Sequence, residues 1–241
     1  KDRIAFKFSI FNMKAVILAA GEGTRMRPLT LKKPKPMLEL LGKPILHHIW
    51  ELLPREINEV ILVVGYKAEQ IRAYFGDRFL GKKLTYVIQQ EKKGTADALF
   101  LARPHLDPKE KFLLLYADDL HSKESIEKCL ATEQGILVYP VKNPKEFGVV
   151  ITDKKGNIAD IEEKPKAPKT NIAAVGVYVL DSRIFNYPPT RSENGEYYLT
   201  SMIAKMLKDH PVQAVETSFW HPIGYPDDLA AAERILQKRK K

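Results

Sequence analysis

Apolar residues recur along this chain with two spacings, and the two alternate through its first half. Short runs rich in branched apolar residues predict buried strands at residues 15–18, 60–64, 84–88, 111–117 and 136–141. Stretches with apolar residues on one face predict helices at residues 44–53, 68–75, 95–102 and 122–130. This alternation predicts an α/β fold with a doubly wound, mostly parallel sheet and helices on both of its faces.

The second half of the chain shows a different pattern. Strands are predicted at residues 147–152, 157–161 and 172–180, with turn signals such as residues 153–156 between them. They indicate an antiparallel lobe added over the mouth of the parallel sheet. Two more helices are predicted at residues 196–208 and 228–237, and Asp227 or Asp228 suits the cap of the second.

We expect one domain over residues 13–241, because no linker, internal repeat or low-complexity segment divides that range. Met13, Lys14 and Ala15 form a natural start, since the first strand follows at once. Residues 1–12 are interpreted as a leader or upstream extension. Their apolar core, broken by Lys7, is too short for a signal peptide.

Composition narrows the range of partners. Lys and Arg outnumber Asp and Glu by 39 to 30, which gives a formal net charge of +9 and favours an anionic partner. No zinc-finger spacing, RNA-binding aromatic run or basic heptad is present, so a solvated, lysine-rich surface is favoured over a nucleic-acid patch, and the charge alone does not identify the anionic partner. A nucleic-acid-binding protein stays open as a distant alternative.

The single cysteine, Cys129, excludes an intrachain disulfide framework and favours a cytoplasmic location. Its helical setting predicts a buried apolar role. No apolar run approaches the roughly 18 residues that a membrane span needs, so no membrane partner is expected.

The strongest local signal is a hydrophobic strand that runs into a glycine-rich loop with Gly21, Gly23 and Arg25. Glycines let the backbone bend tightly and turn its N–H groups toward phosphates, which a nearby arginine can also bind. Met26 occupies the third glycine position of a dinucleotide fingerprint, and no Walker A motif occurs in the chain. The alternative is an ordinary tight turn with surface arginines.

A second basic segment follows that loop. Pro34 and Pro36 flank Lys35 and stiffen the backbone on both sides of it. With Arg25, Arg27 and Lys33, it completes a group of four cations expected to lie near the phosphate-binding loop. A basic solvated loop is the alternative interpretation.

Together these segments resemble the sugar-1-phosphate nucleotidyltransferases, or nucleotide-sugar pyrophosphorylases, over residues 13–236. The resemblance lies in the glycine-rich loop and the Lys-Pro loop after it, and in a series of later motifs. These later motifs are Gln89, Gly94-Thr95-Ala96, Asp118, Phe147-Gly148-Val149-Val150, Glu162-Glu163-Lys164-Pro165, residues 171–178, Gly195-Glu196 and residues 220–224.

This resemblance implies a Rossmann-like nucleotidyltransferase fold with an antiparallel sugar-binding lobe. The activity it implies belongs to nucleotide-sugar biosynthesis: an NTP and a sugar 1-phosphate give an NDP-sugar and pyrophosphate. It implies nucleotide-binding roles for Ala20, Gly21, Gly23, Thr24, Arg25, Gln89, Gly94 and Thr95, and sugar-phosphate-binding roles for Gly148, Glu163 and Lys164. Arg25, Lys35 and Asp118 are the implied catalytic residues, with Asp118 holding Mg²⁺.

One departure concerns the metal site. Family members carry a Trp-x-Asp sequence near the end, whose aspartate is a second metal ligand, and Pro222 stands at that position here. We expect Asp118 and the substrate phosphates to hold Mg²⁺ alone. The alternatives are that Asp227 or Asp228 reaches in, or that catalysis is weak. Asp119 is equally suited to helix entry, and Asp118 is the residue preferred for the metal.

The default substrates are glucose 1-phosphate with dTTP or UTP, the commonest pairing in the family. Mannose 1-phosphate with GTP is the nearest alternative, and an amino-sugar phosphate follows. A weak, nucleotide-binding regulatory homologue is an alternative of a different class. The sequence ends near residue 241 without the β-helix that some relatives append, so no second acyltransferase activity is expected. A homo-oligomer is left open.

Overall fold

The computed structural model describes residues 13–239, and the expected leader, residues 1–12, lies outside that range. The main helices are α1 (Ile45–Leu52), α2 (Ala68–Phe75), α3 (Thr95–Ala102), α4 (Lys123–Leu130), α5 (Leu199–Met206) and α6 (Pro226–Arg239). The long strands are β1 (Met13–Ala19), β4 (Ile57–Val64), β6 (Lys82–Ile88), β7 (Lys111–Tyr116), β9 (Gly135–Pro140), β10 (Gly148–Thr152), β11 (Ile158–Glu163) and β12 (Ile172–Asp181). The short strands are β2 (Glu39–Leu40), β3 (Lys43–Pro44), β5 (Arg78–Phe79), β8 (Asp119–His121), β13 (Gln213–Glu216) and β14 (Trp220–Pro222).

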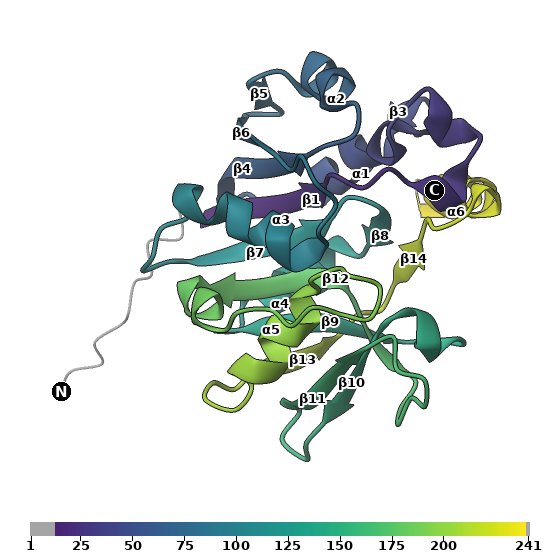
Figure 1. The fold of residues 1–241 in the computed structure, drawn as a ribbon. Coiled ribbons are helices and arrows are strands. Elements are labelled where there is room, and N and C mark those ends of the chain that lie inside the picture. Colours follow the sequence, from purple (N-terminus) through teal and green to yellow (C-terminus); the bar gives the residue numbers. More distant parts are fainter. Residues whose placement is uncertain (1–12, 240–241) are drawn as a thin grey trace.

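One large sheet crosses the molecule, with its strands in the order β11-β10-β12-β7-β1-β4-β6-β5 (Figure 1). Strands β7, β1, β4 and β6 are parallel neighbours. From β1 the chain proceeds outward to β4 and β6, then returns to place β7 on the other side of β1. The strand order therefore reverses between β1 and β7, and the predicted parallel sheet is confirmed.

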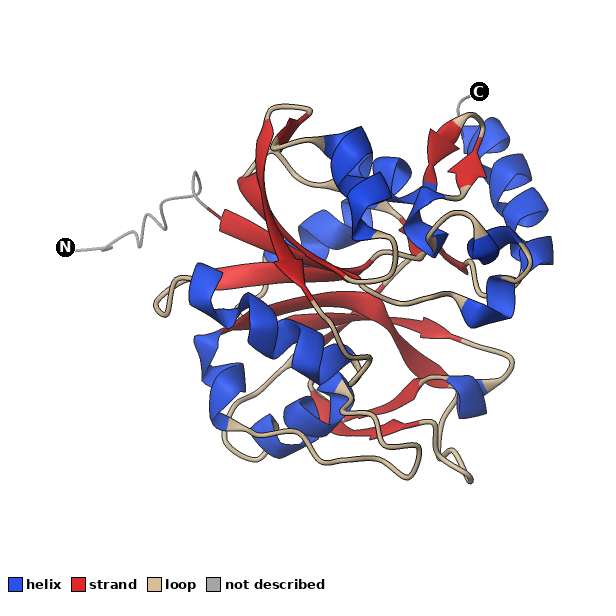
Figure 2. Ribbon diagram, turned by 45° about the horizontal axis from the view of Figure 1, so that its top comes forward, coloured by secondary structure: helices blue, strands red, loops and turns tan. Residues whose placement is uncertain are grey.

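The predicted antiparallel strands are present, and they continue the same sheet rather than forming a separate layer (Figure 2). Strand β12 pairs antiparallel with β10 through its first half, with β7 through its second half, and with β9 through both halves. Its register shifts between Ala174 and Tyr178, where Gly176 has a φ of 78°. Only glycine adopts this backbone conformation without cost, so Gly176 permits the branch.

Both faces of the sheet are covered by helices. Along β1, Ala15 and Ile17 face a core formed with α1, α2 and α4, whereas Val16 faces a core formed with α3 and α5. Strands buried on both faces need apolar residues at successive positions, which is the pattern seen in the sequence. No helix among residues 13–239 is both long and apolar enough to cross a membrane.

The helix boundaries show what the hydrophobic pattern missed. Helices α2 and α3 match their predicted ranges, but α5 begins at Leu199, three residues after the predicted start. Helix α6 begins at Pro226, two residues early, because proline suits the first helical position. Asp228 caps this helix from its third position: its Oδ2 accepts the Tyr225 N–H at 2.7 Å.

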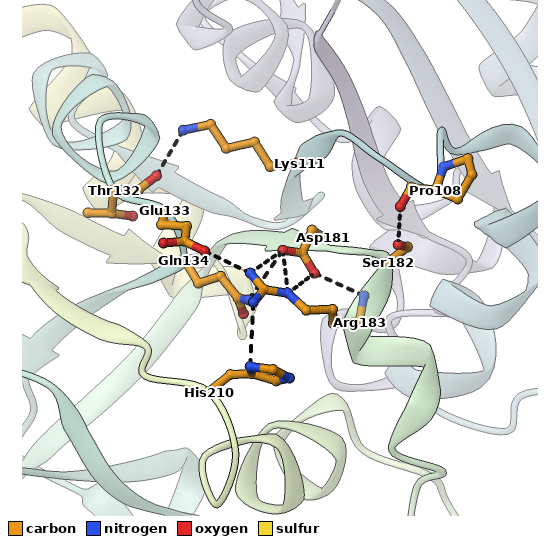
Figure 3. Close-up of polar contacts among 9 residues, drawn as sticks. All are labelled: Pro108, Lys111, Thr132, Glu133, Gln134, Asp181, Ser182, Arg183 and His210. Carbon is orange, nitrogen blue, oxygen red and sulfur yellow. Dashed lines mark hydrogen bonds and ion pairs between the residues drawn. The ribbon is translucent and has the colours of Figure 1, made fainter. Parts of the chain in front are cut away.

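A network of charged side chains connects the segments around the start of β7 (Figure 3). Arg183 donates from Nη2 to Asp181 Oδ2 at 2.6 Å and to Glu133 Oε1 at 2.9 Å. Its Nη1 lies 3.4 Å from Nδ1 of His210, and Lys111 donates to the Thr132 carbonyl. These contacts join the end of β12 to the loops after α4 and α5, at the edge opposite to Asp118.

The predicted burial of Cys129 is confirmed, since it lies in α4 within the core. Burial raises the pKa of its thiol to about 12. Because only the thiolate reacts, we expect Ellman's reagent at pH 8 to label native protein on the order of 10³-fold more slowly than protein unfolded in guanidinium. A single cysteine makes the signal unambiguous. Labelling at the same rate in both states would contradict the buried placement.

Candidate active site

The parallel strands β1, β4, β6 and β7 all end at one edge of the sheet. The loop after β1 carries Gly21, Gln89 follows β6, and Asp118 follows β7. Ligands of open α/β sheets bind outside the carboxyl ends of the strands where the strand order reverses. That point lies between β1 and β7, so the fold itself selects this edge as the candidate site.

Three adjoining cavities occupy this edge. The central cavity, about 390 Å³, is lined by seven of the predicted residues: Arg25, Lys35, Thr95, Asp118, Gly148, Glu163 and Lys164. The β1 cavity, about 290 Å³, is lined by Gly21, Gly23, Thr24, Arg25, Lys35, Thr95 and Asp118 among others. The Gln89 cavity, about 300 Å³, is lined by Ala20, Gly21, Gly23, Thr24, Gln89, Gly94 and Thr95 among others. Every predicted site residue therefore lines at least one of the three.

The glycine-rich loop folds back on the Lys-Pro loop. Gly23 has a φ of 63°, and a Cβ there would lie 2.8 Å from Lys35 Cβ. The Thr30 hydroxyl donates to the Gly23 carbonyl at 2.8 Å. Gly21 differs, because a Cβ there would meet nothing within 4 Å. The fold requires glycine at position 23 but gives no packing reason for glycine at position 21.

Lys35 and Asp118 form the central ion pair of the site. Lys35 Nζ lies 2.6 Å from Asp118 Oδ2, and the two side chains are 9% and 37% exposed. The lysine is thus held in the wall, while the carboxylate remains open to the cavity. Without a ligand, each neutralises the other, and an incoming phosphate or cation would compete for one partner.

The amide of Gln89 is held in one orientation. Its Nε2 donates to Asp97 Oδ2 at 2.8 Å and to the Gly94 carbonyl at 3.1 Å. Both partners are acceptors, so they fix the nitrogen and leave Oε1 as the acceptor of this side chain. Sequence reasoning did not find Asp97, which lies in the first turn of α3.

Glu163 and Lys164 enter the central cavity from the end of β11. Glu163 Oε2 accepts the Thr200 hydroxyl at 3.0 Å, and burial raises the pKa of its carboxyl. Lys164 has a φ of 45°, and its Nζ lies 4.7 Å from the centre of the Tyr198 ring. A Cβ on Gly148 would lie 2.8 Å from Thr200 Cγ2, so this glycine leaves room for the hydrogen-bonded pair of Glu163 and Thr200.

The predicted group of four cations is brought together only in part. Arg25 and Lys35 line the central and β1 cavities. Arg27 instead pairs with Glu22 at 3.7 Å, and Lys33 pairs with Glu39 at 2.6 Å. Expecting all four in one group was wrong, because acidic neighbours bind two of them outside these cavities.

Aromatic and acidic residues complete the central cavity, and sequence reasoning gave most of them no ligand role. They include Tyr116, Asp119, Tyr178, Tyr198, Trp220 and Tyr225. Arg25 lies over the Tyr225 ring, 5.2 Å from its centre. Burial and the nearby Asp118 raise the pKa of the Asp119 carboxyl well above its ordinary value, and Lys35 opposes them. The interpretation of Asp119 as a helix-entry residue was wrong: it belongs to β8, while Ser122 caps α4.

The acidic residues near position 222 test the remaining expectations for a metal site. Asp228 accepts N–H bonds from Gly224 and Tyr225, so its carboxylate is occupied as a helix cap. In residues 13–239, no three His, Cys, Asp or Glu side chains could hold a metal together. Mg²⁺ commonly uses one or two carboxylates, with phosphates and waters completing its shell. Asp118 and Asp119 in one cavity fit that requirement.

Comparison with known proteins gives a consistent result. The model of the family described as nucleotidyl transferase matches residues 14–239. A Methanocaldococcus jannaschii protein, bifunctional protein GlmU, is 37% identical over 93% of this chain and 54% of its own length. A Haloferax volcanii protein, UTP–glucose-1-phosphate uridylyltransferase AglF, is 34% identical over 94% of this chain and 97% of its own. The chain thus spans about half the length of the GlmU relatives.

Solved structures agree on the fold. A Bacillus anthracis protein assigned as a glucose-1-phosphate thymidylyltransferase superposes with a TM-score of 0.82. It is 27% identical, and the match covers 92% of this chain and 94% of the other. A UDP-glucose pyrophosphorylase superposes with a TM-score of 0.80 at 21% identity, over 95% and 100% of the two chains, and supports the fold alone.

Gly94 and Gly21 should respond differently to an added methyl group. Gly94 has a φ of 97°, and a Cβ there would lie 2.5 Å from the Tyr197 carbonyl oxygen. We expect Gly94→Ala to lower the free energy of unfolding by about 1–3 kcal/mol or more. Gly21→Ala, its matched control, should change it by less than about 0.5 kcal/mol. Urea unfolding measures both, and equal losses would contradict the difference in packing.

Proposed function

Because this chain belongs to the nucleotidyl transferase family, we propose that it transfers a nucleoside monophosphate from an NTP to a sugar 1-phosphate. The phosphate oxygen of the sugar attacks the α-phosphorus of the NTP. The bond between that phosphorus and the β-phosphate oxygen breaks, and pyrophosphate leaves. The observation that carries the proposal is the convergence of every residue with an implied catalytic, nucleotide-binding or sugar-phosphate-binding role, from separate segments of the chain, on three adjoining cavities.

Phosphoryl transfer depends chiefly on positioning and charge neutralisation, and the cleft offers both. Arg25 lines both the β1 and central cavities, where it can bind the departing pyrophosphate. Lys35, directed at Asp118, can bind the reacting phosphates. A Mg²⁺ ion held by Asp118 would add charge neutralisation and orientation of the phosphates. No protein base is needed, because the attacking phosphate oxygen is already ionised.

The Gln89 cavity suits the base of the nucleotide. With its nitrogen bound to Asp97 and Gly94, Gln89 can offer Oε1 as an acceptor. Uracil and thymine present an N3–H donor to such an acceptor, and guanine presents N1–H. Adenine has no ring N–H on that edge. This orientation supports the default of UTP or dTTP and keeps GTP with mannose 1-phosphate as the alternative.

The other half of the cleft suits the sugar 1-phosphate. Glu163 can accept hydrogen bonds from ring hydroxyls, and Lys164 can bind the phosphate. The named activity of the Haloferax relative supports glucose 1-phosphate as the sugar substrate. A weak, nucleotide-binding regulatory role remains the second candidate, favoured by Pro222 alone.

The first test measures pyrophosphate release with Mg²⁺ across five NTPs and four sugar 1-phosphates. We expect release with glucose 1-phosphate and UTP or dTTP, and its loss on adding EDTA. Release only with GTP and mannose 1-phosphate would select the alternative substrates. No release, together with a nucleotide-induced rise in melting temperature, would support the regulatory role, and no response in either assay would refute both.

Arg25 and Arg27 form a matched pair for a second test. Both are exposed, but Arg27 lines none of the three cavities. We expect Arg25→Ala to lower kcat/KM by about 10²–10³-fold, the scale of losing one charge-stabilising donor. Arg27→Ala should stay within about threefold of the parent, and both variants should keep its melting temperature. Equal effects on kcat/KM would show that general basicity, not position, matters.

A further inference from the structure

The short strands β8 and β14 bring two distant parts of the chain together at the central cavity. They pair antiparallel, and in this register Pro222 stands directly opposite Asp119. Residues directly opposite in an antiparallel pair point to the same face, with Cβ atoms roughly 5 Å apart. Both residues line the central cavity. A side chain at position 119 therefore lies beside one at position 222 and faces the same cavity.

Asp119 is built into the cavity wall. It is 9% exposed, and a Cβ on Gly176 would lie 3.1 Å from its Oδ2, so the glycine makes room for the carboxylate. Within residues 13–239, no Lys or Arg forms an ion pair with it, since Lys35 is bound to Asp118. Among the buried side-chain nitrogens of residues 13–239, Trp220 Nε1 has no hydrogen-bond partner. A buried carboxyl that lacks a cationic partner is disfavoured in its charged form, and a cation placed in the cavity would stabilise that form.

The other acidic residues of this cavity are already engaged. Asp228 caps α6, and Glu163 accepts from Thr200 at 3.0 Å. Glu146 accepts from Asn143 at 2.5 Å. Asp118 pairs with Lys35 but keeps 37% of its side chain exposed, and Asp119 has no ion pair within residues 13–239, so these two neighbouring carboxylates can share a cation.

We propose that Asp119 takes the place of a carboxylate at position 222, so that Asp118 and Asp119 together hold one divalent cation against the substrate phosphates. This inference rests on the proposed function. Both ligands then come from the end of β7 and the start of β8, and Pro222 forms an apolar wall beside them. Two carboxylates close together repel each other, and a divalent cation relieves that repulsion.

The test measures Mn²⁺ binding by electron paramagnetic resonance, with UTP present and no sugar phosphate. We expect Asp119→Asn to weaken Mn²⁺ binding by about 10–100-fold, and Asp118→Asn to do the same. Adding Pro222→Asp to Asp119→Asn should recover at least tenfold of the loss. Asp227→Asn, the matched control, should leave Mn²⁺ affinity unchanged, since Asp227 lines none of the three cavities.

Melting temperature separates a ligand role from a purely structural one. Without metal, Asp119→Asn should melt no lower than the parent, because asparagine keeps the shape of the side chain and removes a buried ionisable group. A lower melting temperature together with weaker Mn²⁺ binding would overturn the proposal in favour of a structural role. Unchanged Mn²⁺ affinity in Asp119→Asn would also overturn it.

Pyrophosphate release by the parent distinguishes this failure from failure of the proposed function. If the parent releases pyrophosphate while Asp119→Asn binds Mn²⁺ normally, the proposed function stands and Asp119 is not a ligand. If the parent neither releases pyrophosphate nor binds Mn²⁺, both proposals fail.

Discussion

The arrangement of this molecule depends on one constraint, that four parallel strands must end at the same edge of the sheet. Strands buried on both faces cannot carry polar side chains along their length, so polar residues collect in the loops beyond the strand ends. The reversal of strand order between β1 and β7 separates two of these loops and leaves space between them. Antiparallel β12 then brings the β10–β11 hairpin to the same edge, which places Gly148 and Glu163 opposite the glycine-rich loop.

The charged side chains of this cleft differ in how deeply they are buried. Lys35 is buried in the wall, Asp118 is open, and Arg25 lies at the exposed rim over an aromatic ring. A half-buried pair such as Lys35 and Asp118 adds little net stability, because desolvation of the lysine offsets much of the attraction. Its value is geometric: it holds a cation and an anion ready at one point, where a charged ligand can replace either partner.

Much of the fold could be predicted because long elements repeat their pattern several times. The apolar runs of β4 and β7 and the faces of α2 and α3 each have enough residues to show their period. Strands β8 and β14 have three residues each, and their pairing joins residues about a hundred positions apart, so no local pattern could reveal it. The loops were predicted as sites, but Asp97 and Asp119 were missed as site residues, because their importance comes from neighbours in space. The predicted grouping of Arg27 and Lys33 with the other cations was wrong for the same reason, because nearby acidic residues determine where each side chain lies.

The ladder between β8 and β14 has a consequence for how such sites change over time. A sequence motif is defined by residues along one strand, whereas ligand binding depends on the positions of the oxygen atoms that contact the ligand. Two facing positions on paired strands can each present a ligand group to the same cavity. Two substitutions can therefore remove the group from one strand and introduce it on the other. The sequence motif would then be lost from one segment, while the chemistry of the site was unchanged. Sheets in which short strands pair around a cleft have many such facing positions. We expect their sequence motifs to change faster than their activities.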